Sequence, residues 1–554
     1  LNLKYGKPSA RAIYAPFISR ANALTLENGL VGALSARGAY FLSTYDSWRQ
    51  QLTENNQITT FIDLGYGIFE GPKIEIVCII LRKKIDNSID SSAMFIRLLD
   101  VKDKEGLLRR CVNGDEETIT RIFSHHTSSF TSIPTSPFAY WYPDKFYGLF
   151  KNWMPLKSDI FVTCQGMSTT DDFRYMRLRE EIVEHAEWPL IAKGGEYATY
   201  YSSLDMRINW GENGRDLKGN KKAVLRNHTH YFKSGITWTE GTTSCFSSRY
   251  LPDGSAISGS GQGIYSLSDN TSEVIFGLLG YLNSRLSHVI IESMVSSGDF
   301  SRADGVVRHY STDLIGRVPI PSLETLNKII EPAKKLHTIQ EKISSLLNYQ
   351  EDDLLIVVGN KDFSISNYCR ESWLKIGGMV SEGIMLINQI DKIIESASGF
   401  QGDYLDQLSG PLFVEESYCK DLAEIEELLL LSDSELVEQA FSIYPVRRIK
   451  KLGCFINRRL ELIALISESS VGSFTHLLAG DQYNPLSEED LAYMILDRII
   501  SNFFLSDVSI LGRSSSGESC GLSEIVRSEI NRISSKPDEL ECEILSKIKV
   551  SSLN

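Results

Sequence analysis

The chain has 554 residues, of which 42% are hydrophobic and 23% charged, and its formal net charge at pH 7 is −14. This length exceeds what one hydrophobic core supports, so it predicts about three domains of an ordinary globular protein. Nine cysteines are scattered singly with no Cys-x-x-Cys pair, a pattern that disfavours a disulfide framework and favours reduced thiols in a cytoplasm.

Helical and β-branched segments alternate through the first 85 residues. Residues 14–26 read as a helix, residues 29–42 as a strand and turn leading into a helix near Trp48, and residues 58–64 and 73–81 as strands.

A possible cofactor loop, Asp63-Leu64-Gly65-Tyr66-Gly67, lies between the last two of these strands. A nucleotide-type cofactor loop needs a helix after its glycine turn, whose N-terminus covers the cofactor. A strand comes here at once, which leaves no room for the helix. The segment is therefore predicted to be a closing β-hairpin at the sheet edge, with the cofactor loop as the alternative.

Residues 86–155 differ in composition from the first 85. They begin with mixed charges and Ser-rich breaks, and they continue with Ser, Thr and Pro around the aromatic residues at 138–142. This composition predicts a linker or an inserted lid. The longest apolar run of the chain, residues 76–81, is far too short to cross a bilayer, and no signal peptide is visible. We therefore expect an intracellular protein without a membrane segment.

Glycines, aromatic residues and cations gather in residues 192–250. Residues 215–233 contain six Lys or Arg and one Asp, a local net charge of +5 in an acidic chain. A cationic island of this kind predicts local phosphate contact, because the overall field would repel DNA. Paired glycines allow a turn with positive φ, and aromatic faces allow stacking. The alternative is a solvated loop beside a small Trp/Tyr core.

The candidate DNA-binding residues are cations, glycines and aromatic residues in or near this stretch: Lys193, Gly194, Gly195, Tyr197, Lys221, Lys222, Arg226, Lys233, Trp238, Arg249 and Arg285. Arg285 lies in a helical segment, where a solvated arginine on a core-facing helix is the alternative to a phosphate contact. His228-x-His230 lacks a third ligand nearby, so no metal site is predicted.

Helical periodicity dominates the C-terminal part. Apolar residues recur close to a 3.5-residue period through residues 323–347, which predicts one long helix. The remainder, to residue 554, reads as mainly helical.

Several short motifs fall in one order along the chain. In chain order they are Gly-Met-Ser-Thr-Thr-Asp-Asp-Phe-Arg at 166–174, Lys-Gly-Gly-Glu-Tyr at 193–197, Gly-Ile-Thr-Trp at 235–238, Phe-Ser-Ser-Arg-Tyr-Leu-Pro-Asp-Gly at 246–254, Leu-Asn-Ser-Arg at 282–285 and Ile-Gly-Arg-Val-Pro-Ile-Pro at 315–321. Their order and spelling resemble the large adenine-specific DNA methyltransferases of BREX-type phage-defence systems and related type IIG restriction-modification enzymes. The likeness covers residues 2–322 well and the remainder loosely.

The resemblance implies an α/β fold class with three regions. We expect a partial Rossmann-like class I methyltransferase core at residues 1–85, then, after the linker or lid at 86–155, a mixed α/β target-recognition region at 156–322. The last region, at 323–554, is expected to be mainly helical, with a spacer and a C-terminal helical domain.

The first residues depart from the family pattern. Asn2-Leu3-Lys4-Tyr5 stands where the family carries Asn-Pro-Pro and then Tyr or Phe. The resemblance implies that Asn2 accepts a hydrogen bond from the amine of a flipped adenine and that Tyr5 stacks on the base. Both prolines, which fix φ, are absent, and Lys4 brings a cation close to a positive sulfonium. We therefore do not expect catalytic competence.

The family's methyl donor is S-adenosylmethionine, and its loop precedes the Asn-Pro-Pro motif. This chain begins at that motif, so we expect a truncated, split or alternatively started protein that does not bind the cofactor alone. The expected function is that of a DNA-binding, adenine-specific (N6) methyltransferase-like protein, inactive by itself.

Two alternatives remain. The first is a non-catalytic recognition subunit that binds double-stranded DNA and acts with a separate methyltransferase fragment or other defence-system proteins. The second is a stand-alone enzyme that uses the segment from Asp63 to Gly67 for its cofactor. No nuclease signature is visible.

Overall fold

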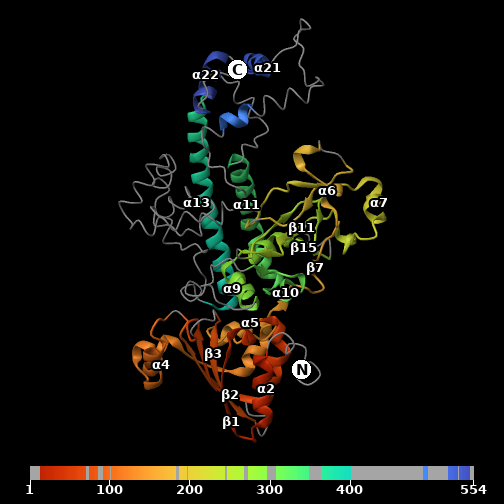
Figure 1. Cartoon of the computed structure of the whole chain (residues 1–554). Coiled ribbons are helices and arrows are strands. Elements are labelled where there is room, and N and C mark those ends of the chain that lie inside the picture. Colours follow the sequence, from red (N-terminus) through yellow and green to blue (C-terminus); the bar gives the residue numbers. More distant parts are fainter. Residues whose placement is uncertain are drawn as a thin grey trace.

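The computed structural model shows a mixed α/β protein with long helices after its two largest sheets (Figure 1). An N-terminal sheet lies at one end of the molecule, a second sheet lies beside helix α11, and helix α13 extends away from the N-terminal sheet. The structure describes residues 13–69, 74–84, 92–99, 101–182, 186–195, 197–243, 246–267, 273–295, 307–347, 363–400, 491–496, 522–534 and 536–548.

The N-terminal sheet has five strands in the order β1-β3-β2-β4-β5. Strand β3 is antiparallel to both β1 and β2, whereas β2 and β4 are parallel. The predicted helices and strands of the first 85 residues are confirmed as α2 (Tyr14–Leu24), β1 (Leu30–Ala36), α3 (Asp46–Asn55), β2 (Asn56–Gly65) and β3 (Ile76–Lys83).

The segment after β2 forms the predicted hairpin. Strands β2 and β3 pair antiparallel, and the described residues between them contain no helix. The Asp63 carboxylate is fully buried, where it accepts hydrogen bonds from Arg37 Nε at 2.9 Å and Tyr140 Oη at 3.0 Å. The antiparallel strand after the glycine turn and the bound Asp63 carboxylate therefore favour the hairpin over the cofactor loop. The hairpin is not at the sheet edge, since β4 extends the sheet beyond β2.

The prediction of a linker or lid at residues 86–155 is also wrong for the described residues. Two strands from this segment, β4 (Ser92–Arg97) and β5 (Ile122–His126), complete the N-terminal sheet. The aromatic residues Phe138, Tyr140 and Tyr142 are fully buried in the core, and Tyr140 stacks on Phe95 with ring centroids 5.1 Å apart. The N-terminal unit therefore extends to about residue 155.

A second, antiparallel sheet lies within the predicted target-recognition region. Its strands have the order β13-β11-β15-β7 and span Phe161–Cys164 (β7), Gly235–Thr239 (β11), Ser248–Leu251 (β13) and Gly261–Ser266 (β15). A short parallel pair, β9 (Ile191–Ala192) with β14 (Ala256–Ile257), lies alongside it. The region is mixed α/β, as expected.

Helices dominate the described residues after the second sheet. Helices α8 (Val274–Leu282) and α9 (Arg285–Met294) are almost entirely buried, and α8 packs against α11 (Leu323–Leu347). The long helix predicted at 323–347 is confirmed at those bounds. Further described helices of this region include α13 (Ile365–Ser398), α21 (Leu522–Ile533) and α22 (Pro537–Lys547).

Among the described helices, none by itself has the length and apolarity to cross a bilayer. Helices α8 and α9, which are bent by 67° relative to each other, reach that length and apolarity only when they are taken together.

Candidate nucleic-acid interface

Three segments that are far apart in the sequence meet at one end of the second sheet. We call residues 166–174, 191–195 and 257–261 the loop cluster. The Met167 N–H donates to the Ile257 carbonyl at 3.0 Å, and the Gly259 N–H donates back to the Met167 carbonyl at 2.8 Å. The Ser258 N–H donates to the Ala192 carbonyl at 2.9 Å, which joins the third segment.

Glycines permit this close approach of backbones. A Cβ at Gly166 would lie 2.1 Å from the Ile257 carbonyl oxygen, and a Cβ at Gly261 would lie 2.5 Å from the Ala192 carbonyl oxygen. Gly194 and Gly195 adopt φ values of +88° and +137°, a conformation that side chains of L residues rarely allow. The predicted glycine turn at 194–195 is therefore present.

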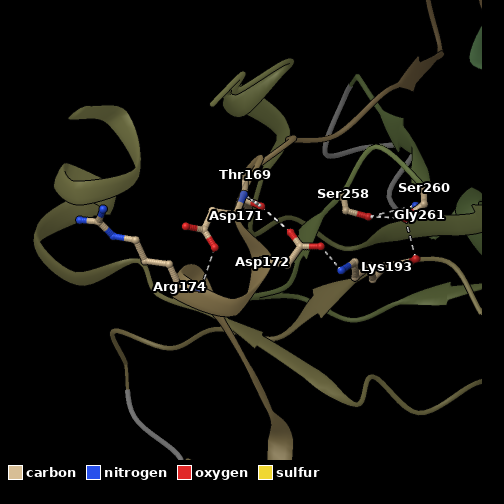
Figure 2. A network of polar contacts seen from close by, with 8 residues as sticks. All are labelled: Thr169, Asp171, Asp172, Arg174, Lys193, Ser258, Ser260 and Gly261. Atoms are coloured by element: carbon tan, nitrogen blue, oxygen red, sulfur yellow. Dashed lines mark hydrogen bonds and ion pairs between the residues drawn. The ribbon is translucent and has the colours of Figure 1, made fainter. Parts of the chain in front are cut away.

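A polar network joins the cluster across its surface (Figure 2). The Asp172 carboxylate accepts hydrogen bonds from Thr169 Oγ1 and Lys193 Nζ, and the Ser260 hydroxyl donates to the Lys193 carbonyl at 2.7 Å. Partial burial acts to raise the pKa of Asp172, but the bonds from Lys193 and Thr169 outweigh it and the pKa falls below its usual value. Asp172 is therefore ionised at neutral pH and holds Lys193 in place.

The basic segment predicted from composition is fixed beside this network. Ser168 and Val224 exchange backbone hydrogen bonds of 2.9 Å in both directions. The Asn220 side-chain amide donates to the Thr169 carbonyl at 3.3 Å, and that of Asn227 donates to the Gln165 carbonyl at 2.9 Å.

The cations of that segment face solvent. Lys221, Lys222 and Arg226 are all exposed. Val224, in the same segment, is hydrogen-bonded to Ser168 of the loop cluster, so these cations belong to a segment held beside the cluster. Exposed cations on a fixed backbone suit contacts to phosphates.

Three candidate residues are buried instead. Trp238 is fully buried and donates its indole N–H to the Tyr310 carbonyl at 2.8 Å, so no ring face is available to a base. Arg249 is 2% exposed and donates to Thr239 Oγ1 at 3.0 Å beneath the glycine turn. We correct the prediction for both residues: Trp238 belongs to the hydrophobic core, and Arg249 supports the glycine turn from inside.

Arg285, the third, is likewise a structural residue. It begins α9, and its guanidinium lies 3.7 Å from the Asp391 carboxylate and 3.4 Å from that of Glu395, both in α13. Its backbone N–H also donates to Asp391 at 3.0 Å. Arg285 therefore forms an ion pair between two helices and does not face solvent, where a phosphate could reach it. The alternative interpretation was correct that the helix faces the core, but wrong that the arginine is solvated.

Of the remaining candidates, two lie within the described residues and two do not. Tyr197 is half-buried beside the glycine turn, and Lys233 is exposed after Phe232. Asn2 and Tyr5 lie outside the described residues. Within the described ranges, no group of three or more His, Cys, Asp or Glu residues is placed to hold a metal ion.

Sequence reasoning missed the roles of Thr169, Asp172 and Ser260. The motif at 166–174 stands out by its spelling, and its Thr-Thr-Asp-Asp run is a recognisable signal for side chains that bond nearby backbone. Asp171 shows this directly, because its side chain accepts from the Arg174 N–H at 3.3 Å and caps the short helix α6 (Asp172–Tyr175).

Comparisons with known proteins agree with the motifs. The chain is 24% identical over 405 residues to "Adenine-specific methyltransferase BrxX" of Escherichia coli O9:H4 (strain HS), covering 70% of this chain and 31% of that protein. It is 24% identical over 322 residues to "Adenine-specific methyltransferase PglX" of Lacticaseibacillus casei (strain Zhang), covering 54% of this chain and 26% of that protein. The chain is a homologue of adenine-specific methyltransferases of the BREX kind.

The matched region of the methyltransferase homologues is partial: the chain spans about a third or less of their length. No protein-family model matches. Two solved structures are similar at low TM-scores, the type IIL restriction-modification enzyme MmeI in complex with DNA and the type IIG restriction endonuclease BpuSI. MmeI is 11% identical, with a TM-score of 0.39 and coverage of 70% of this chain and 49% of its own. BpuSI is 12% identical, with a TM-score of 0.25 and coverage of 72% and 51%.

Proposed function

We propose that this chain is the DNA-binding portion of an adenine-specific (N6) DNA methyltransferase-like protein of a phage-defence or restriction-modification system, acting in the cytoplasm. The observation that carries the proposal is the set of exposed cations on an acidic chain: Lys193 in the loop cluster, and Lys221, Lys222 and Arg226 in the segment hydrogen-bonded to it. Local cations supply the sequence-independent part of duplex binding.

The chain is proposed to be inactive alone. S-adenosylmethionine is the methyl donor that the relatives' activity requires, and the one described segment that resembles its loop is a hairpin whose Asp63 is bound by Arg37 and Tyr140. The described residues around this hairpin do not fit the cofactor, so we assign no catalytic step to them.

The test combines two assays on the purified protein. We expect fluorescence anisotropy to detect binding to duplex DNA in preference to single strands. We also expect no transfer of label from S-adenosylmethionine to the DNA. Absence of duplex binding would contradict the DNA-binding part of the proposal, and adenine methylation by the chain alone would contradict its inactivity.

A second candidate is a recognition subunit that works with a separate methyltransferase chain. It is favoured by apolar side chains exposed on α2 and on the neighbouring strand β1: Phe17, Leu24, Leu30 and Leu34. Within the described residues, β1 pairs with a strand on one side only. Exposed apolar residues beside an open strand edge suit an α/β partner that adds a strand.

Co-expression with the cofactor-binding domain of such a methyltransferase tests this candidate by size-exclusion chromatography. Phe17→Asp and Leu34→Asp are expected to abolish co-elution, because each buries a charge in the interface. Ile119→Asp, at an exposed apolar residue elsewhere in the same unit, is expected to leave it intact. Co-elution that survives both interface substitutions would rule out this surface.

A further inference from the structure

Phe173 is the most exposed large apolar side chain in the described part of the molecule, at 96%. It belongs to α6, in which Tyr175, two residues later, is buried. The short helix thus has one aromatic ring anchored in the protein and one projecting into solvent. A phenylalanine left in water forgoes about 1.5 to 3 kcal/mol that burial would supply.

The backbone that carries Phe173 is held on both sides. Before it, Asp172 is bonded to Thr169 and Lys193 within the loop cluster (Figure 2). After it, Arg177 Nη1 donates to the carbonyl oxygens of Phe173 and Met176, both at 2.6 Å. The ring therefore projects from a fixed support.

One exposed cation directly follows the ring. Arg174 is exposed and its side chain points away from the Asp172–Lys193 pair (Figure 2), whereas the charge of Lys193 is paired with Asp172. Duplex DNA offers two phosphate backbones with stacked bases between them. Proteins that contact both place cations on the phosphates and, in many cases, an apolar wedge such as Phe between base steps.

We propose that Phe173 is a wedge that inserts at a base step of bound duplex DNA, a role that rests on the proposed DNA-binding function. Insertion removes the ring from water and unstacks the bases beside it. Unstacking costs least where the bases are already mispaired. A wedge therefore gives the protein a preference for duplexes that contain a mismatch.

The experiment measures anisotropy Kd values for two random-sequence duplex pools of equal length, one fully paired and one with a central mismatch. The wild type is expected to bind the mismatched pool at least about five-fold more tightly. Phe173→Ala is expected to lose this preference while it keeps the same dependence of affinity on salt. Phe173→Trp is expected to retain the preference.

The matched control is Ile119→Ala, at a residue 72% exposed in the N-terminal unit, which is expected to behave as the wild type. Melting temperatures confirm that every variant is folded. If Phe173→Ala binds both pools as the wild type does, the wedge is overturned and the proposed DNA binding stands. If the wild type binds neither pool, both are overturned, and a role for Phe173 in contacting another protein takes their place.

Discussion

Thr170, inside the loop cluster, adopts a φ of +60°, a conformation that is strained for a β-branched residue. We expect Thr170→Gly to raise the free energy of unfolding by about 1 kcal/mol, because the strain exceeds the entropy that glycine adds to the unfolded chain. Thermal melting measures the effect. Thr131→Gly, at an exposed threonine whose φ is not positive, should lower the melting temperature. A lower melting temperature for Thr170→Gly as well would show that the backbone of Thr170 is not strained.

His288 of α9 is buried, and burial together with the positive charge of Arg308 lowers the pKa of its imidazole to about 3, from an ordinary 6.5. The folded state therefore binds this proton less readily than the unfolded state, and stability is lost as pH falls from 6.5 toward 3. The slope approaches about 1.4 kcal/mol per pH unit for one proton.

The test is the difference between wild type and His288→Gln. Burial raises the pKa of the Glu292 carboxyl, and burial raises the pKa of the Asp391 carboxyl to about 6. These two groups therefore add stability as the pH falls, opposite to His288, and they are present in both proteins. Between pH 7.5 and pH 5, chemical denaturation should show a larger decrease in the free energy of unfolding for the wild type than for His288→Gln. Equal decreases for the two proteins would mean that His288 is protonated in the folded state.

At the scale of elements, the α8–α9 junction ties the second sheet to the long helices. Asn283, between the two helices, exchanges hydrogen bonds with the Ser248 backbone at 2.9 and 3.0 Å, and Arg285 bonds α13 through Asp391. The motif at 282–285, which resembles a motif of DNA-modifying enzymes, therefore has an architectural role.

Arg285→Ala should cost about 3 kcal/mol or more at pH 8, since it leaves the Asp391 carboxylate buried without its cation. The cost should shrink at pH 5, because burial raises the pKa of Asp391 to about 6 and the carboxyl is then neutral. Urea denaturation at the two pH values measures this. Arg109→Ala, which breaks an exposed pair with Glu105, is the control and should leave stability unchanged. A cost for Arg285→Ala that is the same at both pH values would argue against a buried, titrating Asp391.

Periodicity predicted the elements that depend on local pattern. The strands and helices of the first 85 residues and helix α11 are of this kind, because their apolar residues recur at the spacing that each element buries. Residues 138–142 were misread, since Ser and Pro around aromatic residues resemble a loop although the rings fill the core. Composition likewise predicted a basic segment, whose lysines are exposed, but not the burial of Trp238 and Arg249.

At the scale of the whole molecule, the loop cluster was beyond sequence reasoning because it is assembled from segments far apart in the sequence. Gly166 lies against Ile257, and Gly261 lies against Ala192, so no local window contains the site. The chain carries a net charge of −14, and the proposed duplex binding must overcome that field through a few local cations.

The dependence of duplex DNA affinity on salt tests the role of the loop cluster most directly. Each phosphate contact contributes about −0.9 to the slope of log K against log salt. The double variant Lys221→Gln/Lys222→Gln should reduce the magnitude of that slope by about 1.8, whereas Lys102→Gln/Lys151→Gln, two exposed lysines of the N-terminal unit, should leave it unchanged. Equal slopes for the wild type and both double variants would contradict the assignment of DNA binding to the loop cluster.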